Sequence, residues 1–374
     1  MTLFILGVIT TLVILFMFGR LKLSSGRPAI ERAINRKLSA GPYIVAVGGG
    51  TGLSTLLRGI KSFTRNITAV VAVTDEGGSS GRIRNEWGML PPGDVRNCIA
   101  ALAENDSELR RILDYRFDRG ELKGHSLGNL LLLAVTEMSG DFSRAVEKMN
   151  HLLSIRGRVL PVTTEGITLM GKTHDGLTVK GELSISEHGR DLSEIWLEPQ
   201  DAKPLPDVLS AVDDADVILL GPGSLFTSVI PNILMKDFAD KLRDSSVPSI
   251  YICNLMTQPE ETQGFSIVRH LEWVSAALGK CPDYIITNSE AIPEDIVERY
   301  AQDGASPLYL DDEQRKVIRD MGCEYVEADI MSVWDSAKEK RVLRHDSRNT
   351  QEKGNARSNG GNNGGGRRFR NKKK

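Results

Sequence analysis

Three glycine-rich segments hold most of the side chains that could carry out chemistry. The first reads Gly48-Gly-Gly-Thr-Gly-Leu-Ser54 and has four glycines in its first five positions. Backbone N–H groups of such a loop, with the N-terminus of a following helix, can bind phosphate. The segment lacks the Gly-Lys-Ser/Thr of a P-loop, and Leu53 occupies the place of the third glycine of a dinucleotide fingerprint. A tight turn needs fewer glycines, so we interpret these residues as contacts to a phosphate or ribose: Gly49, Gly50, Thr51, Gly52 and Ser54.

The second segment runs from Thr74 to Arg82 as TDEGGSSGR. An acid at the end of a strand, here Asp75, can accept ribose hydroxyls or hold a hard cation such as Mg²⁺ that bridges a diphosphate. Arg82 or Arg84 could pair with phosphate, and a plain surface loop is the alternative. We take Asp75 as a candidate metal ligand, and as ligand-binding candidates we add Gly78, Ser79, Ser80 and Arg82.

The third segment, Gly221-Pro-Gly-Ser-Leu-Phe-Thr-Ser228, places hydroxyls where a helix would begin and could hold a second phosphate. An activated serine is not indicated, because the G-x-S-x-G pattern is absent around Ser224. His125 has no acid at a suitable spacing, so a Ser/His/Asp mechanism is not expected either. We assign no catalytic residue, and the ligand-binding candidates of this segment are Gly221, Gly223, Ser224, Thr227 and Ser228.

Further polar residues follow expected strands or begin expected helices. The carboxyl ends of parallel strands form the edge at which open α/β sheets bind ligands. Residues placed at or near that edge complete the set of candidates: Asp94, Asn97, His125, Asn129, Asn254, Thr257, Gln258 and Asn288. Together the motifs predict a protein that binds a diphosphate-containing ligand.

Short β-branched runs alternate with helical segments between residues 41 and 337, which predicts an α/β, Rossmann-like domain around a parallel sheet. We expect strands at residues 43–47, 67–73, 216–220, 249–253 and 284–287. Apolar residues at helical spacing predict an amphipathic helix directly after the first glycine segment. A helical insertion at 94–138, with Asp94 as N-cap, and a β-rich insertion at 159–197, with a hairpin turn at Asp175-Gly176, interrupt the alternation.

The charges of the 374-residue chain are segregated, although 47 basic and 49 acidic residues leave a net charge of only −2. Residues 1–40 carry six basic residues and one acidic residue, and residues 338–374 carry thirteen and three. The balance excludes a uniformly basic nucleic-acid binder and a uniformly acidic disordered protein. We expect three parts: a membrane anchor with a basic segment (1–40), the Rossmann-like domain (41–337) and a basic, disordered tail (338–374).

The two ends of the chain suggest partners. Leu3–Gly19 is seventeen residues without a charge, and at about 1.5 Å per residue it could just span a bilayer. Basic residues follow this run and none precedes it, which favours a single N-terminal anchor over a cleaved signal peptide or a buried helix. We therefore expect the protein on the cytoplasmic face of the plasma membrane. For the tail, contact with anionic lipid, contact with RNA and no partner at all stay open.

Four cysteines are widely spaced along the chain, with no C-x-x-C pair and no histidine at metal-ligand spacing: Cys98, Cys253, Cys281 and Cys323. Neither a disulfide framework nor a zinc site is expected. We interpret the cysteines as small buried apolar residues in a reducing compartment.

Six sequence blocks occur in one order, at residues 46–61 (AVGGGTGLSTLLRGIK), 74–84, 90–102, 124–132 (GHSLGNLLL), 221–232 and 254–262 (NLMTQPEET). In that order they resemble the YvcK-like gluconeogenesis-factor family, a sister of CofD, the 2-phospho-L-lactate transferase. The resemblance covers residues 41–333. It implies a Rossmann-like fold that binds UDP-sugars, notably UDP-N-acetylglucosamine. It also implies a role in cell shape and peptidoglycan balance during growth on gluconeogenic carbon.

The CofD relatives imply an alternative activity. They transfer a phospholactyl group from a nucleotide diphosphate to a deazaflavin, with a divalent metal near an acid that matches Asp75. Two positions depart from the family pattern: Asp75-Glu76 replaces paired aspartates, and Glu260 stands in place of a glycine. We expect a UDP-sugar-binding regulator, with a CofD-like metal-dependent transferase as the alternative. Mg²⁺ is the candidate cofactor, no nicotinamide or flavin is expected, and we expect a homo-oligomer.

Overall fold

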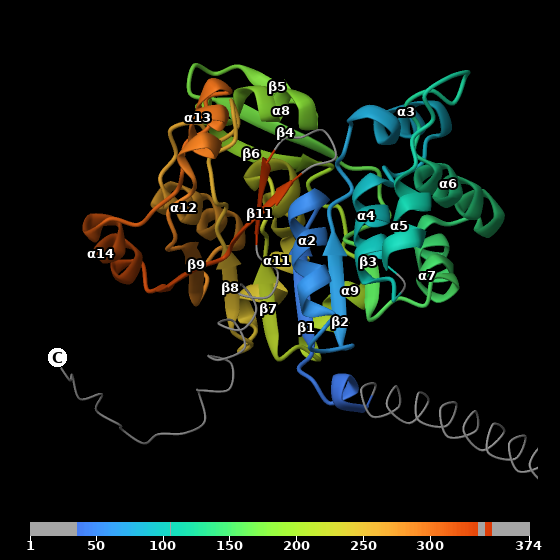
Figure 1. Cartoon of the computed structure of the whole chain (residues 1–374), viewed down its shortest axis with the longest axis horizontal. Helices are drawn as coiled ribbons and strands as arrows, with labels where there is room; N and C mark the ends of the chain where they lie inside the picture. The colour runs from blue at the N-terminus through green and yellow to red at the C-terminus, as the bar shows by residue number, and fades with distance from the viewer. Residues whose placement is uncertain (1–35, 105, 336–340, 346–374) are drawn as a thin grey trace, which may run out of the picture.

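A seven-stranded parallel sheet forms the centre of the computed structural model, which describes residues 36–104, 106–335 and 341–345 (Figure 1). Every neighbouring pair of strands in this sheet is parallel. In spatial order the strands are β10 (Glu324–Ala328), β9 (Tyr284–Asn288), β8 (Ser249–Ile252), β7 (Val217–Leu220), β1 (Ile44–Gly48), β2 (Ile67–Val71) and β3 (Arg158–Pro161). The expected α/β, Rossmann-like fold is confirmed.

The sheet has a topological switch point between β1 and β7. The chain first moves outward from β1 to β2 and β3, and it then returns to place β7 on the other side of β1. The segments that follow β1 and β7 must therefore leave the sheet side by side at its carboxyl edge. In open α/β sheets this is where ligands bind.

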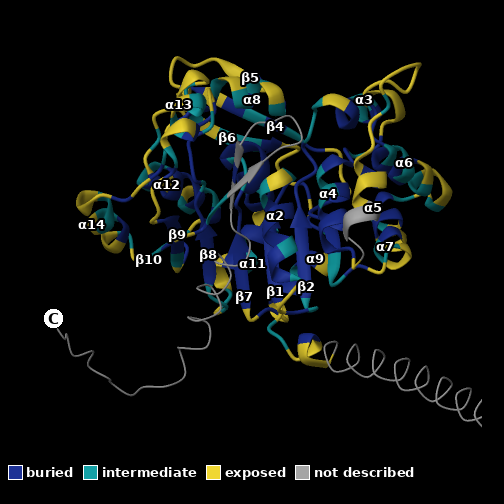
Figure 2. Cartoon of the chain, viewed as in Figure 1, coloured by how far each residue is buried: buried dark blue, intermediate teal, exposed yellow. Residues whose placement is uncertain are grey.

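The five expected strands are confirmed to within two residues at each end. Val159 was placed in the β-rich insertion, but it pairs with Ala69 of β2 and so belongs to the main sheet. β10 was not expected, because its sequence, EYVEA, has two glutamates in five residues and no continuous apolar run, as suits a strand at the edge of the sheet. The sheet interior is the dark blue centre of Figure 2.

Helix α2 (Gly50–Ile60) follows β1 and packs against α4 (Gly93–Leu102) in front of the sheet in Figure 1. The four apolar residues of α2 that recur at helical spacing are at most 1 % exposed, so its buried face is the one expected. The other helices beside the main sheet are α9 (Pro206–Asp213), η2 (Leu225–Val229), α10 (Ile230–Ile233), α11 (Lys236–Asp244), α12 (Ile267–Leu278), α13 (Glu294–Gln302) and α14 (Asp312–Asp320).

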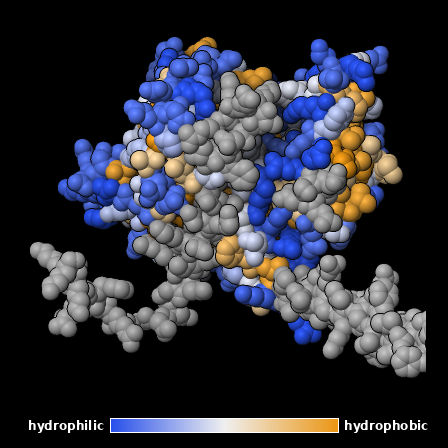
Figure 3. Space-filling model, viewed as in Figure 1, coloured by the Kyte–Doolittle hydropathy of each residue, from blue (hydrophilic) through white to orange (hydrophobic). Residues whose placement is uncertain are grey.

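The helical insertion lies between β2 and β3 and consists of α3 (Gly78–Trp87), α4, α5 (Asp106–Asp114), α6 (Leu127–Ser139) and α7 (Phe142–Leu152). Asp94 was expected to cap α4, but Pro92 occupies the N-cap position and Asp94 lies in the first turn. Its carboxylate is therefore available for contacts outside the helix. Apolar side chains gather on the surface around α6 (Figure 3), where Met138 is 81 % exposed.

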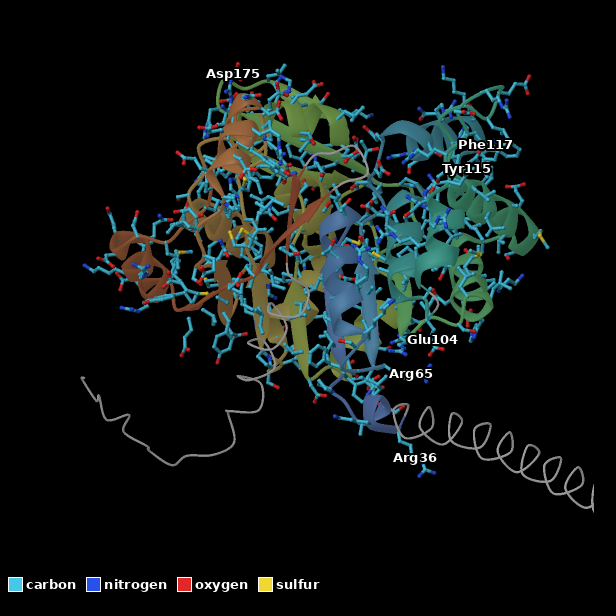
Figure 4. All side chains as sticks on the ribbon, viewed as in Figure 1. Arg36, Arg65, Glu104, Tyr115, Phe117 and Asp175 are labelled. Atoms are coloured by element: carbon cyan, nitrogen blue, oxygen red, sulfur yellow. The ribbon has the colours of Figure 1, made fainter. Side chains whose placement is uncertain are left out.

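The β-rich insertion is a separate antiparallel sheet in the order β5-β4-β6, built from β4 (Thr168–Thr173), β5 (Thr178–Lys180), α8 (Glu182–His188), η1 (Gly189–Asp191) and β6 (Leu192–Glu198). The predicted hairpin turn is present, with Gly176 at a φ of +91° and Asp175 at the outer end of the hairpin (Figure 4). β11 (Met331–Asp335) and β12 (Arg341–His345) form a third, two-stranded sheet.

The predicted membrane location must be corrected. No helix among the described residues is long and apolar enough to cross a bilayer. Leu3–Gly19, the segment on which the anchor and the localisation depended, lies outside those residues. The structure thus gives the anchor no support, and the prediction of an N-terminal anchor is withdrawn. Most of the predicted basic tail likewise lies outside the described residues.

Candidate functional site

The two glycine loops after β1 and β7 lie against each other. A Cβ atom added to Gly52 would lie 2.3 Å from the carbonyl oxygen of Pro222, and one added to Gly223 would lie 3.5 Å from the Gly49 carbonyl oxygen. Asn232 joins the loops, because its Nδ2 donates to the Gly48 carbonyl oxygen at 3.2 Å. The absence of a side chain at Gly52 thus permits a close backbone approach.

A cavity of about 610 Å³ opens where these loops meet. Thirteen of the twenty-three candidate residues line it, namely Gly49, Gly50, Thr51, Gly52, Asp75, Asp94, Gly223, Ser224, Thr227, Ser228, Asn254, Thr257 and Gln258. They come from segments separated by up to about two hundred residues in sequence. The sheet topology brings them to one place, since each follows a parallel strand or packs beside one.

Two helix starts border the cavity. α2 begins at Gly50, and the first N–H groups of a helix have no acceptor within the helix. On the facing loop, η2 begins after Ser224, whose hydroxyl accepts from the Thr227 N–H at 3.1 Å. Asn254 fixes this loop by accepting from the Gly223 N–H at 3.3 Å and donating to its carbonyl oxygen at 2.9 Å. The arrangement concentrates backbone donors and hydroxyls around the cavity.

Carboxylates also line the cavity, and Asp94 lies directly against the first glycine loop, where a Cβ added to Gly49 would be 2.5 Å from its Oδ2. Burial, followed by the charges of Asp75 and Glu182, raises the pKa of Asp94 from 3.8 to about 7. Burial also raises the pKa of Glu182 from 4.5 to about 7, although the Glu76 N–H donates to its carboxylate at 2.9 Å. Repulsion among these acids adds to both pKa shifts, so a fraction of the Asp94 and Glu182 carboxyls is protonated near neutral pH.

Glu261 holds the glycine loop that follows β7 in place by hydrogen bonds. Its Oε1 accepts from the Ser224 hydroxyl at 2.5 Å and from the Phe226 N–H at 2.9 Å, and the residue is 3 % exposed. Burial raises the pKa of this carboxyl. Glu261 was not among the candidates, although it lies in the sequence block at 254–262 that carried the family resemblance.

The remaining lining residues also escaped the sequence analysis: Thr55, Glu182, Ser186, Pro222, Leu255, Met256, Pro259, Tyr300 and Leu343. Glu182 and Ser186 come from α8 of the β-rich insertion, Tyr300 from α13 and Leu343 from β12. Glu182 follows a hairpin and had no recognisable motif around it. Tyr300 and Leu343 give one part of the cavity an aromatic and apolar wall.

Ten candidates do not line the cavity: Ser54, Gly78, Ser79, Ser80, Arg82, Asn97, His125, Asn129, Gly221 and Asn288. Three of them form a separate buried cluster, in which the Ser79 hydroxyl lies 3.1 Å from both His125 Nδ1 and Asn129 Nδ2. Burial and the nearby Arg82 charge lower the pKa of His125, which favours the neutral imidazole.

Other candidates make structural hydrogen bonds. Arg82 donates to the Lys123 carbonyl oxygen at 2.7 Å, and Asn288 Nδ2 donates to the Glu290 carbonyl oxygen at 2.6 Å. The Ser54 hydroxyl donates to the Thr51 carbonyl oxygen at 3.0 Å inside α2. These side chains thus have structural partners away from the cavity lining or within a helix.

The cavity has features that suit Mg²⁺ bound together with a ligand. Within the described part of the chain, no three His, Cys, Asp or Glu side chains are arranged to hold a metal by themselves. Mg²⁺ usually takes only one or two carboxylates and completes its coordination with water and substrate phosphates. Asp75 and Asp94 supply such a pair, and a cation between them would relieve the repulsion that raises the Asp94 pKa.

The parallel sheet, its switch point and the glycine-lined cavity define the class, a Rossmann-like α/β protein with a ligand site between two strand–helix loops. The family model described as 2-phospho-L-lactate transferase CofD matches residues 44–331. The chain belongs to the CofD family, and the resemblance to its gluconeogenesis-factor members is confirmed.

Three relatives show the extent of the similarity. The chain is 41 % identical over 308 residues to the gluconeogenesis factor of Bacillus subtilis (strain 168), which covers 82 % of this chain and 94 % of that protein. It is 44 % identical over 277 residues to the gluconeogenesis factor of Halalkalibacterium halodurans, with coverage of 74 % and 86 %. A crystal structure of a UPF0052 family member from Bacillus halodurans gives a TM-score of 0.78 at 40 % identity, and covers 84 % of this chain and 98 % of that chain.

Proposed function

We propose that the cavity binds a UDP-sugar of the UDP-N-acetylglucosamine type. The protein would act as a regulator of cell shape and cell-wall balance during gluconeogenic growth. The observation that carries the proposal is the convergence of two helix starts, several hydroxyls and a set of acids on one cavity of about 610 Å³. Small-molecule sites have volumes of about 300–1,000 Å³. The name of the relatives, gluconeogenesis factor, supports the growth condition.

The diphosphate would lie beside the start of α2, where backbone N–H groups favour anions, and would face the hydroxyls of Ser224, Thr227 and Ser228 on the other loop. Among the described residues, none of those lining the cavity is Lys, Arg or His, whereas four are carboxylic acids. An anionic diphosphate therefore needs a cation to offset these charges. Mg²⁺ held by Asp75 and Asp94 would supply it, so we expect binding to depend on a divalent metal.

The rest of the ligand would occupy the remaining wall. Asn254, Thr257 and Gln258 offer amide and hydroxyl groups for a base or a sugar, and Tyr300 offers a ring on which a base can stack. The Ser79–His125 contact is the one that most resembles a nucleophile–base pair, and it does not line the cavity. This favours a binding protein over an acyl- or glycosyl-transferring enzyme that uses a serine nucleophile.

Thermal unfolding of the full chain with UDP-N-acetylglucosamine and Mg²⁺ tests the proposal. Ligand at about a hundred times its Kd adds about 2.7 kcal/mol of stability, so Tm should rise by several degrees. EDTA and the Asp75→Asn variant should each remove the shift. Asp118→Asn, whose side chain is 85 % exposed, is the matched control and should keep it. If no UDP-sugar shifts Tm in the presence of Mg²⁺, the proposal fails.

A CofD-like transferase of a phosphate-linked group from a nucleotide diphosphate donor is the second candidate. The observation that favours it is the pKa of about 7 at both Asp94 and Glu182 inside the cavity, which suits a general base near neutral pH. Metal-dependent product formation that Asp94→Asn abolishes would establish this activity. Ligand binding without product after long incubation would exclude it.

A further inference from the structure

Two of the four cysteines lie side by side, although 42 positions separate them in sequence. Cys281 precedes β9 and Cys323 precedes β10, and these strands are parallel neighbours with Tyr284 opposite Glu324. The Glu324 N–H donates to the Asp283 carbonyl oxygen at 3.0 Å, which holds the two segments side by side, and the two cysteine side chains interact. Both precede their strands and so lie at the amino edge of the sheet, opposite the carboxyl edge that carries the cavity.

The local geometry explains why the two side chains meet. α12 ends at Gly279 with a φ of +77°, and α14 is followed by Gly322 with a φ of +82°. Each glycine closes a helix and turns the chain into the next parallel strand. The two turns are thus helix-to-strand connections to adjacent strands, with Cys281 three residues before β9 and Cys323 directly before β10.

We propose that Cys281 and Cys323 are a redox-sensitive pair that forms an intrachain disulfide in the presence of a hydroperoxide. Cys281 is partly exposed and can meet the oxidant, whereas Cys323 is 2 % exposed and acts as the resolving thiol. The proposal does not depend on ligand binding in the cavity, because the pair lies at the other end of the strands.

The two thiols differ in acidity in the direction that this chemistry needs. The hydrogen bond from Cys323 lowers the pKa of Cys281 to about 7, despite burial and the nearby Asp283 carboxylate. The same contact, with burial and the charges of Asp283 and Glu324, raises the pKa of Cys323. Cys281 is thus the thiolate and the nucleophile.

The reaction balances in two steps. The Cys281 thiolate attacks the peroxide oxygen, the O–O bond breaks, and a sulfenic acid forms with release of one water after protonation. The Cys323 sulfur then attacks the Cys281 sulfur, the S–O bond breaks, and the hydroxyl leaves as a second water with the thiol proton. Each sulfur loses one electron, and the peroxide gains two.

The other two cysteines provide an internal control. Cys98 is fully buried and burial raises its pKa, while Cys253 is 1 % exposed and burial raises its pKa to about 12. Neither is expected to react in the folded protein. Oxidation should therefore lower the number of free thiols, measured after denaturation, from four to two.

The test is peptide mapping of the reduced full chain after treatment with hydrogen peroxide and alkylation. Trypsin cleavage should give a disulfide-linked pair of peptides, 281–299 and 320–338, about 2 Da lighter than the two free-thiol peptides together. Dithiothreitol should separate the pair. In Cys323→Ser, dimedone should instead label Cys281 as a sulfenic acid, and Cys281→Ser should give neither product.

Three results would overturn the proposal. The first is oxidation of Cys281 to the sulfinic acid without any linked peptide. The second is a cross-link between chains, seen as a dimer on a non-reducing gel. The third is equal loss of all four thiols, which would show that the folded structure does not select the pair.

Discussion

The raised pKa of Asp94 predicts how the stability of the protein changes with pH. Between pH 4 and pH 7 the folded protein binds a proton at Asp94 that the unfolded chain, with a pKa of 3.8, has released. Stability must therefore fall as pH rises through this window. From pH 5 to pH 7 the loss is about 2.3 kcal/mol, somewhat less than two full pH units at about 1.36 kcal/mol each, because Asp94 is half ionised at pH 7.

Asp94→Asn isolates this contribution, because asparagine keeps an oxygen that can accept from the Gly50 N–H and has no charge to lose. The free energy of unfolding of the variant, minus that of the wild type, should grow by about 2.3 kcal/mol between pH 5 and pH 7. Glu182 titrates in the same direction, but its contribution is present in both proteins and largely cancels in the difference.

Urea unfolding at a series of pH values, without ligand or metal, is the appropriate measurement. Asp118→Asn, whose side chain is 85 % exposed and lies outside the cavity, is the control measured in parallel. A flat difference for Asp94→Asn, with unchanged m-values, would refute the reasoning. It would mean that water or rearrangement solvates the Asp94 carboxylate better than the lining of the cavity indicates.

Two further predictions concern the packing of the loops. Gly52→Ala would place a Cβ 2.3 Å from the Pro222 carbonyl oxygen, so we expect a lower Tm and weaker UDP-sugar binding. Gly166→Ala is the control, because its Cβ would have no atom within 4 Å, and it should change Tm little in the same assay. Glu261→Ala would leave the buried Phe226 N–H without its acceptor and remove one partner of the Ser224 hydroxyl, and urea unfolding should show a loss of about 1–3 kcal/mol. An unchanged midpoint for either loop variant would contradict the packing described here.

Local sequence patterns were sufficient to predict five of the seven strands of the main sheet and the glycine loops. An apolar run followed by a glycine segment, as at β1 and β7, depends on neighbouring residues only, and these segments folded as expected. The same patterns located the cavity at the carboxyl edge, because a parallel sheet gathers the ends of its strands there. The prediction of Asp94 as N-cap was wrong, because Pro92 occupies the N-cap position and α4 begins at Gly93.

Only the tertiary structure determined which distant side chains share the site. Glu182 reaches the backbone of Glu76 across 106 positions in sequence, and nothing near either residue marks the contact. The structure likewise separated Ser79, His125 and Asn129 from the cavity and brought Cys281 against Cys323. Sequence patterns report the periodicity and turn preferences of adjacent residues. The order of strands and the packing of insertions depend on burial across the whole chain, which no single segment encodes.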